Sequence, residues 1–173
     1  PDWFWVSSPS VKHNVLESTN FPPFKPIVGG NWQKKFWKTR MVAEDERMNA
    51  LVSTGSYKKV ILITLNVINT RQDVKGEIQL PDHLLSIWAD SPKSWLWLLR
   101  SHPGISVSKE YVNSYLKAKS CFNYDFELVS ALPLPVVLRH VTHHVTCCSS
   151  AVWDALEMGV ASALIHRHGY KVY

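Results

Sequence analysis

The feature that most constrains the fold is a long apolar run between residues 58 and 68. β-Branched side chains dominate this run, and Ile61, Ile63, Leu65 and Val67 alternate onto one face of an extended chain. Most of the residues between them are apolar as well. A strand that is apolar on both sides is typical of the centre of a sheet whose two faces are covered. We therefore expect this segment to be a central core strand.

Three helices are expected after this strand. Pro81 suits the first position of a helix that ends near Trp88. Ser91, followed by a proline, has the pattern of a second helix start. The apolar run 95–99 is therefore predicted to lie on that helix and to be buried on nearly every face. Ser108 is placed to cap the third helix.

The last third of the chain has an extended pattern, followed by one helix. Aromatic and polar residues alternate over 122–128, which predicts a half-buried strand. A second strand is expected over 137–148, after a bend at two prolines. A final helix is predicted from Ser149 towards Gly169, and the tail 170–173 is compatible with one more strand.

This order of elements predicts an α+β fold. We expect a single domain over residues 31–173, in which an antiparallel or mixed sheet packs with several short helices. A chain of 173 residues most simply forms one such domain. Residues 1–30 contain five prolines and end in Gly29-Gly30, which indicates an extended, aromatic and proline-rich N-terminal arm.

Several large rings in the arm and in the run 95–99 need a surface on which to pack. An exposed apolar patch of this size promotes aggregation unless a partner covers it. We expect the rings of the arm to join neighbouring copies of the chain. For the run 95–99 we favour core burial, with a self-association face as the alternative. The residues assigned to self-association are Trp3, Phe4, Trp5, Phe21, Phe24, Trp95 and Trp97.

A basic and aromatic cluster between residues 32 and 40 is the best candidate for a binding surface. The chain has a formal net charge of +5 and a pI of about 9.2, which favours polyanionic partners. Rings beside cations are found at lipid headgroups and on nucleic acid. The alternative is a helix whose rings enter the core while its lysines stay solvated. The residues assigned to membrane or nucleocapsid binding are Trp32, Lys34, Lys35, Phe36, Trp37, Lys38 and Arg40.

Histidines and cysteines gather between residues 140 and 148, where they suggest a zinc site. His140 and His144 would share one face of a strand, and His143 and Cys147 the other, each pair roughly 13 Å apart. Neither pair can hold one ion at bond lengths of roughly 2.0–2.3 Å without a bend in the chain. We therefore expect no metal, and whether these residues with Cys148 bind one stays open.

No motif for catalysis or for a cofactor is present. The sequence contains no Walker loop, no GxGxxG and no HExxH, and no catalytic motif surrounds the cysteines. Three cysteines, two of them adjacent, make a poor disulfide framework and favour a reducing compartment. The sequence starts at Pro1 without a charged-then-apolar pattern and contains no apolar run of about 18 residues, so we expect neither a signal peptide nor a membrane-spanning helix. These observations predict a protein without cofactors that is not an enzyme.

Three local patterns resemble the matrix proteins of rhabdoviruses. The first is the apolar strand and polar turn from Val60 to Gly76, which lead into a helix ending at Trp88-Ala89-Asp90. The second pattern is Val152-Trp153-Asp154. The third is Met158-Gly159-Val160 together with Gly169-Tyr170-Lys171-Val172. The chain departs from that family at Pro22-Pro23, which Phe24-Lys25 follows in place of a budding motif with tyrosine. Its short length is similar to that of a plant-infecting member.

The resemblance implies a non-catalytic viral assembly protein that bridges the nucleocapsid to the inner face of the membrane. The partners it implies are other copies of the chain, nucleocapsid or RNA, an anionic membrane surface and a viral glycoprotein tail. The location it implies is the virion beneath the envelope, with the host cytoplasm and nucleus. Two alternatives are an RNA-binding structural component of a large ribonucleoprotein particle and, less favoured, a zinc- or thiol-dependent enzyme.

Overall fold

The computed structural model describes residues 3–6, 9–17, 25–30, 41–66, 78–105, 107–167 and 169–172. The chain divides into two compact units, Pro1–Val42 and Ala43–Tyr173, which are considered separately here. Within the described ranges, no helix is long and apolar enough to cross a membrane.

The N-terminal unit contains a small β–α–β arrangement. Strand β1 (Trp3–Val6) pairs in parallel with β2 (Lys25–Val28), and helix α1 (Pro9–Glu17) connects them. Proline has no amide hydrogen, so Pro9 fits the first position of this helix without losing a hydrogen bond. The predicted arm therefore includes a helix. Its predicted end at residue 30 stays a prediction, because 31–40 lie outside the described residues.

The C-terminal unit is built on a five-stranded sheet with the order β5-β4-β3-β6-β7. All four neighbouring pairs run in parallel. The strands are β3 (Lys59–Thr64), β4 (Trp95–Arg100), β5 (Tyr124–Asp125), β6 (His143–Thr146) and β7 (Ser162–Leu164). Strand β3 is the central one, and five of its six residues are buried, which confirms the prediction of a core strand.

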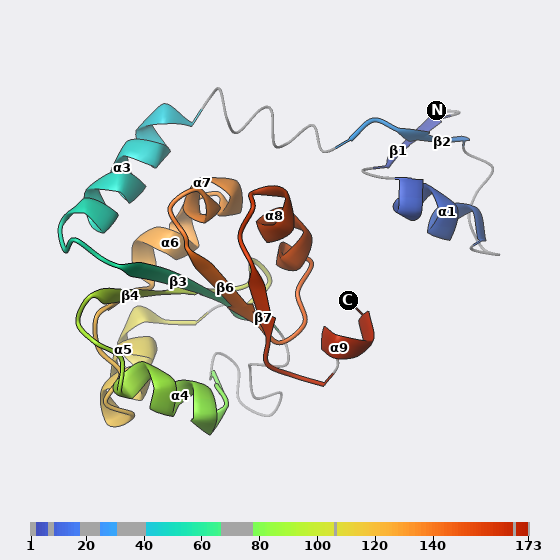
Figure 1. Cartoon of the computed structure of the whole chain (residues 1–173). Coiled ribbons are helices and arrows are strands. Elements are labelled where there is room, and N and C mark those ends of the chain that lie inside the picture. The colour runs from blue at the N-terminus through green and yellow to red at the C-terminus, as the bar shows by residue number, and fades with distance from the viewer. Residues whose placement is uncertain are drawn as a thin grey trace. The chain divides into compact units, whose positions relative to one another are not determined.

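Helices cover both faces of this sheet (Figure 1). Helices α4 (Asp82–Ala89) and α5 (Lys109–Ala118) lie on one side, which we call the α4–α5 face. Helices α6 (Glu127–Ala131), α7 (Leu134–Leu138) and α8 (Ala151–Glu157) lie on the other, the α6–α8 face. The unit begins with α3 (Val42–Ser53) and ends with α9 (Gly169–Val172). The predicted helix starts at Pro81 and Ser108 are confirmed, and the Ser108 hydroxyl accepts a hydrogen bond from the Tyr111 amide.

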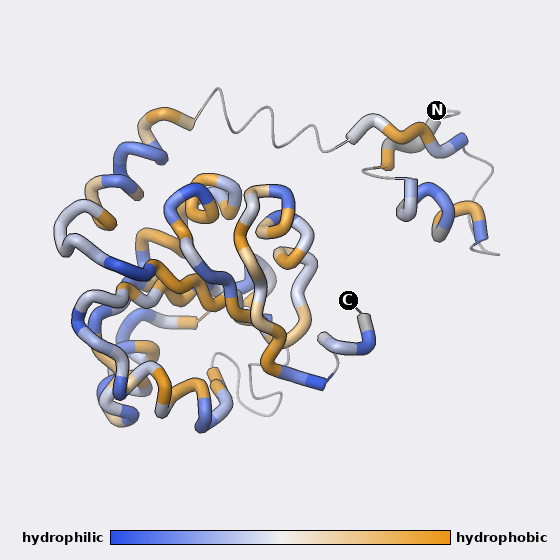
Figure 2. Tube along the Cα trace, in the orientation of Figure 1, coloured by the Kyte–Doolittle hydropathy of each residue, from blue (hydrophilic) through white to orange (hydrophobic). Residues whose placement is uncertain are grey.

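The predicted fold class is wrong, because the sheet is parallel and the architecture is α/β. Helices α4 and α5 connect β3 to β4 and β4 to β5, so strands and helices alternate along the chain. Such β–α–β connections place successive strands in the same direction. The tube coloured by hydropathy shows hydrophobic residues along the middle of the central strand β3, as a strand covered on both faces requires (Figure 2).

The run 95–99 belongs to strand β4 and not to the predicted helix. The Trp97 ring is 2 % exposed and stacks on the ring of Trp88 in α4, with centroids 4.9 Å apart. The indole N–H of Trp97 donates to the Ser91 hydroxyl, and that of Trp88 donates to the Phe122 carbonyl. Both indoles therefore bury their rings in the core and still satisfy their polar atoms.

Other predicted elements in the last third are shorter than expected or of another type. Only Tyr124–Asp125 of the predicted strand 122–128 is a strand, and α6 follows it. Only His143–Thr146 of the predicted strand 137–148 is a strand. The predicted final helix ends at Glu157 and strand β7 follows, while the tail forms the helical turn α9.

Candidate functional site

The strand order places a candidate site at the carboxyl edge of the sheet. The chain passes from β3 to β4 and β5 on one side, then returns to place β6 and β7 on the other. The order reverses between β3 and β6, and ligands of open parallel sheets bind at the carboxyl ends of the strands at such a point. The residues that follow these two strands are therefore the first to consider.

A side-chain hydrogen bond joins the two strand ends at this point. Asn66 follows β3 and is 6 % exposed, and its amide nitrogen donates to the carbonyl of Cys148, 2.5 Å away, after β6. This bond fixes the spacing of the two loops that leave the sheet. The structure contains two cavities at this edge of the sheet.

The first cavity, which we call the Arg100 cavity, lies on the α6–α8 face. Thr64 and Arg100 sit on this face because the neighbouring Ile63, Leu65 and Leu99 point into the core below α4 and α5. The cavity has a volume of about 230 Å³. Its polar lining consists of Thr64, Arg100, Ser101, His102, Ser149, Ser150 and Asp154.

Arg100 carries a positive charge without a carboxylate partner in the part of the chain that the structure describes. Its Nη1 atom donates to the carbonyls of Val129 and Leu132, which holds the end of α6 against β4. The Nε and Nη2 hydrogens have no acceptor among the described residues. Burial lowers the pKa of Arg100, although an arginine remains charged at neutral pH. A partly buried guanidinium with unused donors that face a cavity favours an anionic ligand.

Two further ionisable groups line the same cavity. Burial raises the pKa of Asp154, and the nearby Glu157 raises it further. The Gly104 amide donates to Nδ1 of His102, so the neutral His102 ring carries its hydrogen on Nε2 and can donate from there. The cavity thus combines a fixed cation and hydrogen-bond donors with one carboxylate whose proton affinity is increased.

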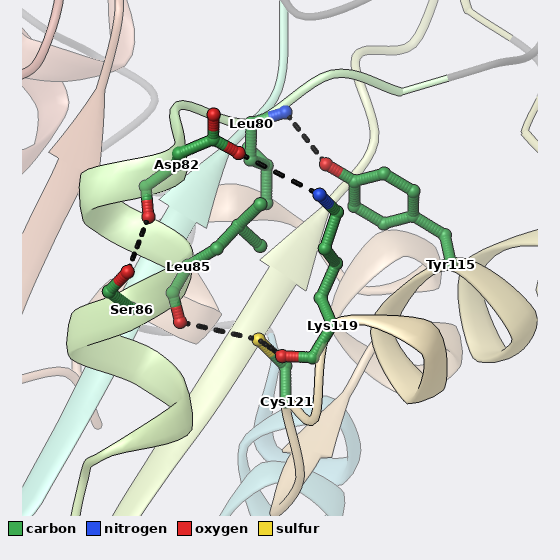
Figure 3. A network of polar contacts seen from close by, with 7 residues as sticks. All are labelled: Leu80, Asp82, Leu85, Ser86, Tyr115, Lys119 and Cys121. Atoms are coloured by element: carbon green, nitrogen blue, oxygen red, sulfur yellow. Dashed lines mark hydrogen bonds and ion pairs between the residues drawn. The ribbon is translucent and has the colours of Figure 1, made fainter.

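The second cavity, which we call the Tyr115 cavity, lies at the same edge in the layer of α4 and α5. Its volume is about 440 Å³. The residues that line it are Gln79, Leu80, Pro81, Asp82, Tyr115, Lys119, Cys147 and His166. Figure 3 shows its polar contacts: the Tyr115 hydroxyl accepts from the Leu80 amide at 3.1 Å, and Lys119 Nζ lies 3.7 Å from Asp82 Oδ1.

The histidine and cysteine cluster is dispersed by the fold. His144 is fully buried, with Nε2 2.9 Å from the Thr64 hydroxyl and Nδ1 2.8 Å from the Ser162 hydroxyl. His143 is exposed on the other face of β6, and His140 contacts Asp45 of α3. The described residues contain no group of three potential metal ligands. His144 is buried because helices cover both faces of a parallel sheet.

Most residues that the sequence assigned to binding or self-association lie outside the residues that the structure describes. Residues 31–40 and the rings of Phe21 and Phe24 lie outside the described residues. Trp3, Phe4 and Trp5 lie on β1, where only their backbone is described. Trp97 is buried within its own unit, and Trp95 is partly exposed beside Lys59, whose Nζ lies 4.2 Å from the ring centroid. Their roles in binding and self-association stay predictions, as do the partners and the localisation.

The residues of the two cavities were missed as functional candidates. Arg100, Ser101 and His102 directly follow an apolar run, and Ser149 follows another. Polar side chains that follow buried parallel strands gather at one edge of the sheet. This pattern of polar residues after apolar runs indicates a site only after the run 95–99 has been assigned to a strand.

No protein-family model matches this sequence, and neither does any curated protein. Among solved structures, the chain is similar to a variant of the wall teichoic acid polymerase TagF, with a TM-score of 0.63 and 12 % sequence identity over 94 % of this chain. A structure of the same variant soaked with CDPG gives a TM-score of 0.58 and 16 % identity over 95 % of this chain. The chain spans only 39 % and 37 % of those two chains. A structure of the kitacinnamycin glycotransferase reaches a TM-score of 0.40, too low for an argument.

These similarities concern the fold, and they contradict the resemblance to a viral matrix protein. The parallel sheet and the similarity of fold to TagF do not fit the α+β architecture that the resemblance implied. The same similarity contradicts the predictions of a non-catalytic virion structural protein and of a chain without enzymatic activity. The short motifs that supported it, such as Val152-Trp153-Asp154, are too brief to identify a fold.

Proposed function

We propose that this chain binds the phosphate portion of a nucleotide-linked donor in the Arg100 cavity and takes part in glycosyl transfer. The observation that carries the proposal is Arg100, a partly buried cation without a carboxylate partner among the described residues, at the carboxyl edge of a parallel sheet. Phosphate supplies the charge and the acceptor atoms that this guanidinium lacks.

The size of the cavity limits what part of the donor it holds. Small-molecule sites usually measure about 300–1,000 Å³. A volume of about 230 Å³ suits a phosphate or diphosphate group better than a whole nucleotide. The serine hydroxyls and the Nε2 hydrogen of His102 offer further donors to phosphate oxygens.

The similarity to TagF supports the reaction class. TagF is a polymerase, and one of its structures was soaked with CDPG. Because the present chain spans 39 % of that protein at most, the complete transfer activity is part of the proposal.

The proposed step moves a sugar or polyol group from phosphate to an acceptor hydroxyl. The hydroxyl oxygen forms the new bond, while the bond to the donor phosphate breaks and its electron pair stays on the phosphate. Arg100 stabilises the charge that develops on this leaving group. The hydroxyl proton passes to a base, and Asp154 is suited to this role because its raised pKa brings its proton affinity closer to neutral pH.

Titration with pyrophosphate tests the proposal. We expect binding in the wild type and a loss of about tenfold or more in Arg100→Met, since a charge-assisted hydrogen bond is worth about 1.5–3 kcal/mol. Arg47→Met, the same change at an exposed arginine of α3, should bind as the wild type does. If Arg100→Met does not fold, Arg100→Lys replaces it as the test variant. It keeps the positive charge and should bind pyrophosphate with intermediate affinity. Equal binding by all variants, or no binding by the wild type, would refute the proposal.

A further inference from the structure

The Tyr115 cavity differs from the Arg100 cavity in its charge. Lys119 and Asp82 contribute one positive and one negative group, 3.7 Å apart, so that their charges balance. An anion placed there would gain from Lys119 and lose to the Asp82 carboxylate. A neutral ligand is repelled by neither of these two charges.

The polar atoms of this cavity include both donors and acceptors. The Tyr115 oxygen already accepts the Leu80 amide hydrogen, and its own hydrogen has no acceptor among the described residues. The Lys119 ammonium adds further donors, the Asp82 carboxylate adds acceptors, and the Gln79 amide supplies both. A hydroxyl group donates and accepts at once, so a ligand with several hydroxyls can satisfy this mixture.

Apolar surface lies beside these atoms. Leu80, Pro81 and the ring of Tyr115 line the same space, where they can contact the C–H groups of a sugar or polyol. The volume of about 440 Å³ lies within the usual range for small-molecule sites, about 300–1,000 Å³.

We propose that the Tyr115 cavity binds a neutral polyhydroxylated group, a sugar or polyol. The inference rests on the proposed function for its setting, because glycosyl transfer requires such a group either in the donor or in the acceptor. Both cavities lie at the carboxyl edge of the sheet, and both are lined by residues that follow β6, Cys147 in the Tyr115 cavity and Ser149 in the Arg100 cavity.

Saturation-transfer NMR with glycerol and with D-glucose tests the site. We expect a signal from at least one probe, and a weakening of about fivefold in Lys119→Met and in Tyr115→Phe, each of which removes hydrogen-bond donors worth about 1 kcal/mol. Lys117→Met is the matched control, because it makes the same change on α5 outside the cavity lining. The absence of any signal, equal binding by both cavity variants and the wild type, or an equal loss in the control would overturn the proposal.

Two further measurements distinguish the possible sources of the ligand and test this proposal independently of the proposed function. If UDP-glucose displaces free glucose, the cavity holds the donor's sugar; if both bind together, it holds the acceptor. Pyrophosphate addresses the Arg100 cavity alone. Sugar binding without pyrophosphate binding would leave the Tyr115 cavity assigned and refute only the proposed function.

Discussion

The two faces of the central sheet are both buried, but they differ in chemistry. The α4–α5 face is packed with apolar and aromatic side chains, among them the stacked Trp88 and Trp97. The α6–α8 face contains a polar row, in which Thr64, His144 and Ser162 are hydrogen-bonded across three strands. Arg100 belongs to this second face. The difference indicates that one face mainly stabilises the fold, while the other carries the groups that make a site.

The largest effect is expected on the apolar face. Trp97→Ala should lower the free energy of unfolding by about 3–5 kcal/mol, because it leaves a cavity against Trp88 and removes the stacked ring. Urea unfolding measures this change. Trp153→Ala, at a ring that is 56 % exposed, should cost about 1 kcal/mol or less. Similar losses in the two variants would contradict the assigned packing.

Lowering the pH should reduce the stability of the fold through His144, which belongs to the polar row. Burial lowers the pKa of His144 to about 4, below the ordinary value of 6.5. Between these values the unfolded chain binds a proton that the folded chain does not, so stability is complete above pH 6.5 and falls as the pH drops towards 4. The loss should reach about 3 kcal/mol, at about 1.4 kcal/mol for each pKa unit.

The measurement is unfolding by urea at several pH values. His144→Gln keeps a hydrogen-bonding side chain without titration, so its stability should change less over this range. His83→Gln, at an exposed histidine of α4, should retain the wild-type slope. Parallel curves for the wild type and His144→Gln would show that His144 is not the group responsible.

The smallest effect concerns the end of the polar row. Ser162→Ala removes the hydroxyl 2.8 Å from His144 Nδ1 and should cost about 1 kcal/mol of unfolding free energy. Ser86→Ala removes an exposed hydroxyl that donates to the Asp82 carbonyl, and it should change stability by less than about 0.5 kcal/mol. Equal values would mean that the row contributes no more than a surface hydrogen bond.

The sequence predicted the central strand and two of the three helices expected after it, those that start after Pro81 and Ser108, better than the sheet around them. The run 58–68 is long and β-branched, which distinguishes a strand from a helix. The run 95–99 is short, has no period and follows Ser91 and a proline, so the same pattern fits a helix start. That one assignment concealed the alternation of strands and helices and, with it, the parallel sheet.

The candidate site was not predictable from local patterns. Thr64, Arg100 and Asp154 are far apart in the sequence, and only the strand order brings them to one cavity. Strands β5 and β7 are two and three residues long, too short for an alternating pattern to indicate them. Gly159, with a φ of 77°, marks the end of α8, where the sequence prediction continued the helix.

The hydrogen bond between Asn66 and Cys148 couples the two loops at the point where the strand order reverses. It ties the loop after β3 to the loop after β6. The residues on either side of Cys148 belong to different cavities, since Cys147 lines the Tyr115 cavity and Ser149 lines the Arg100 cavity. A ligand that shifts this loop in one cavity would therefore change the shape of the other, and shortening the Asn66 side chain would weaken that coupling.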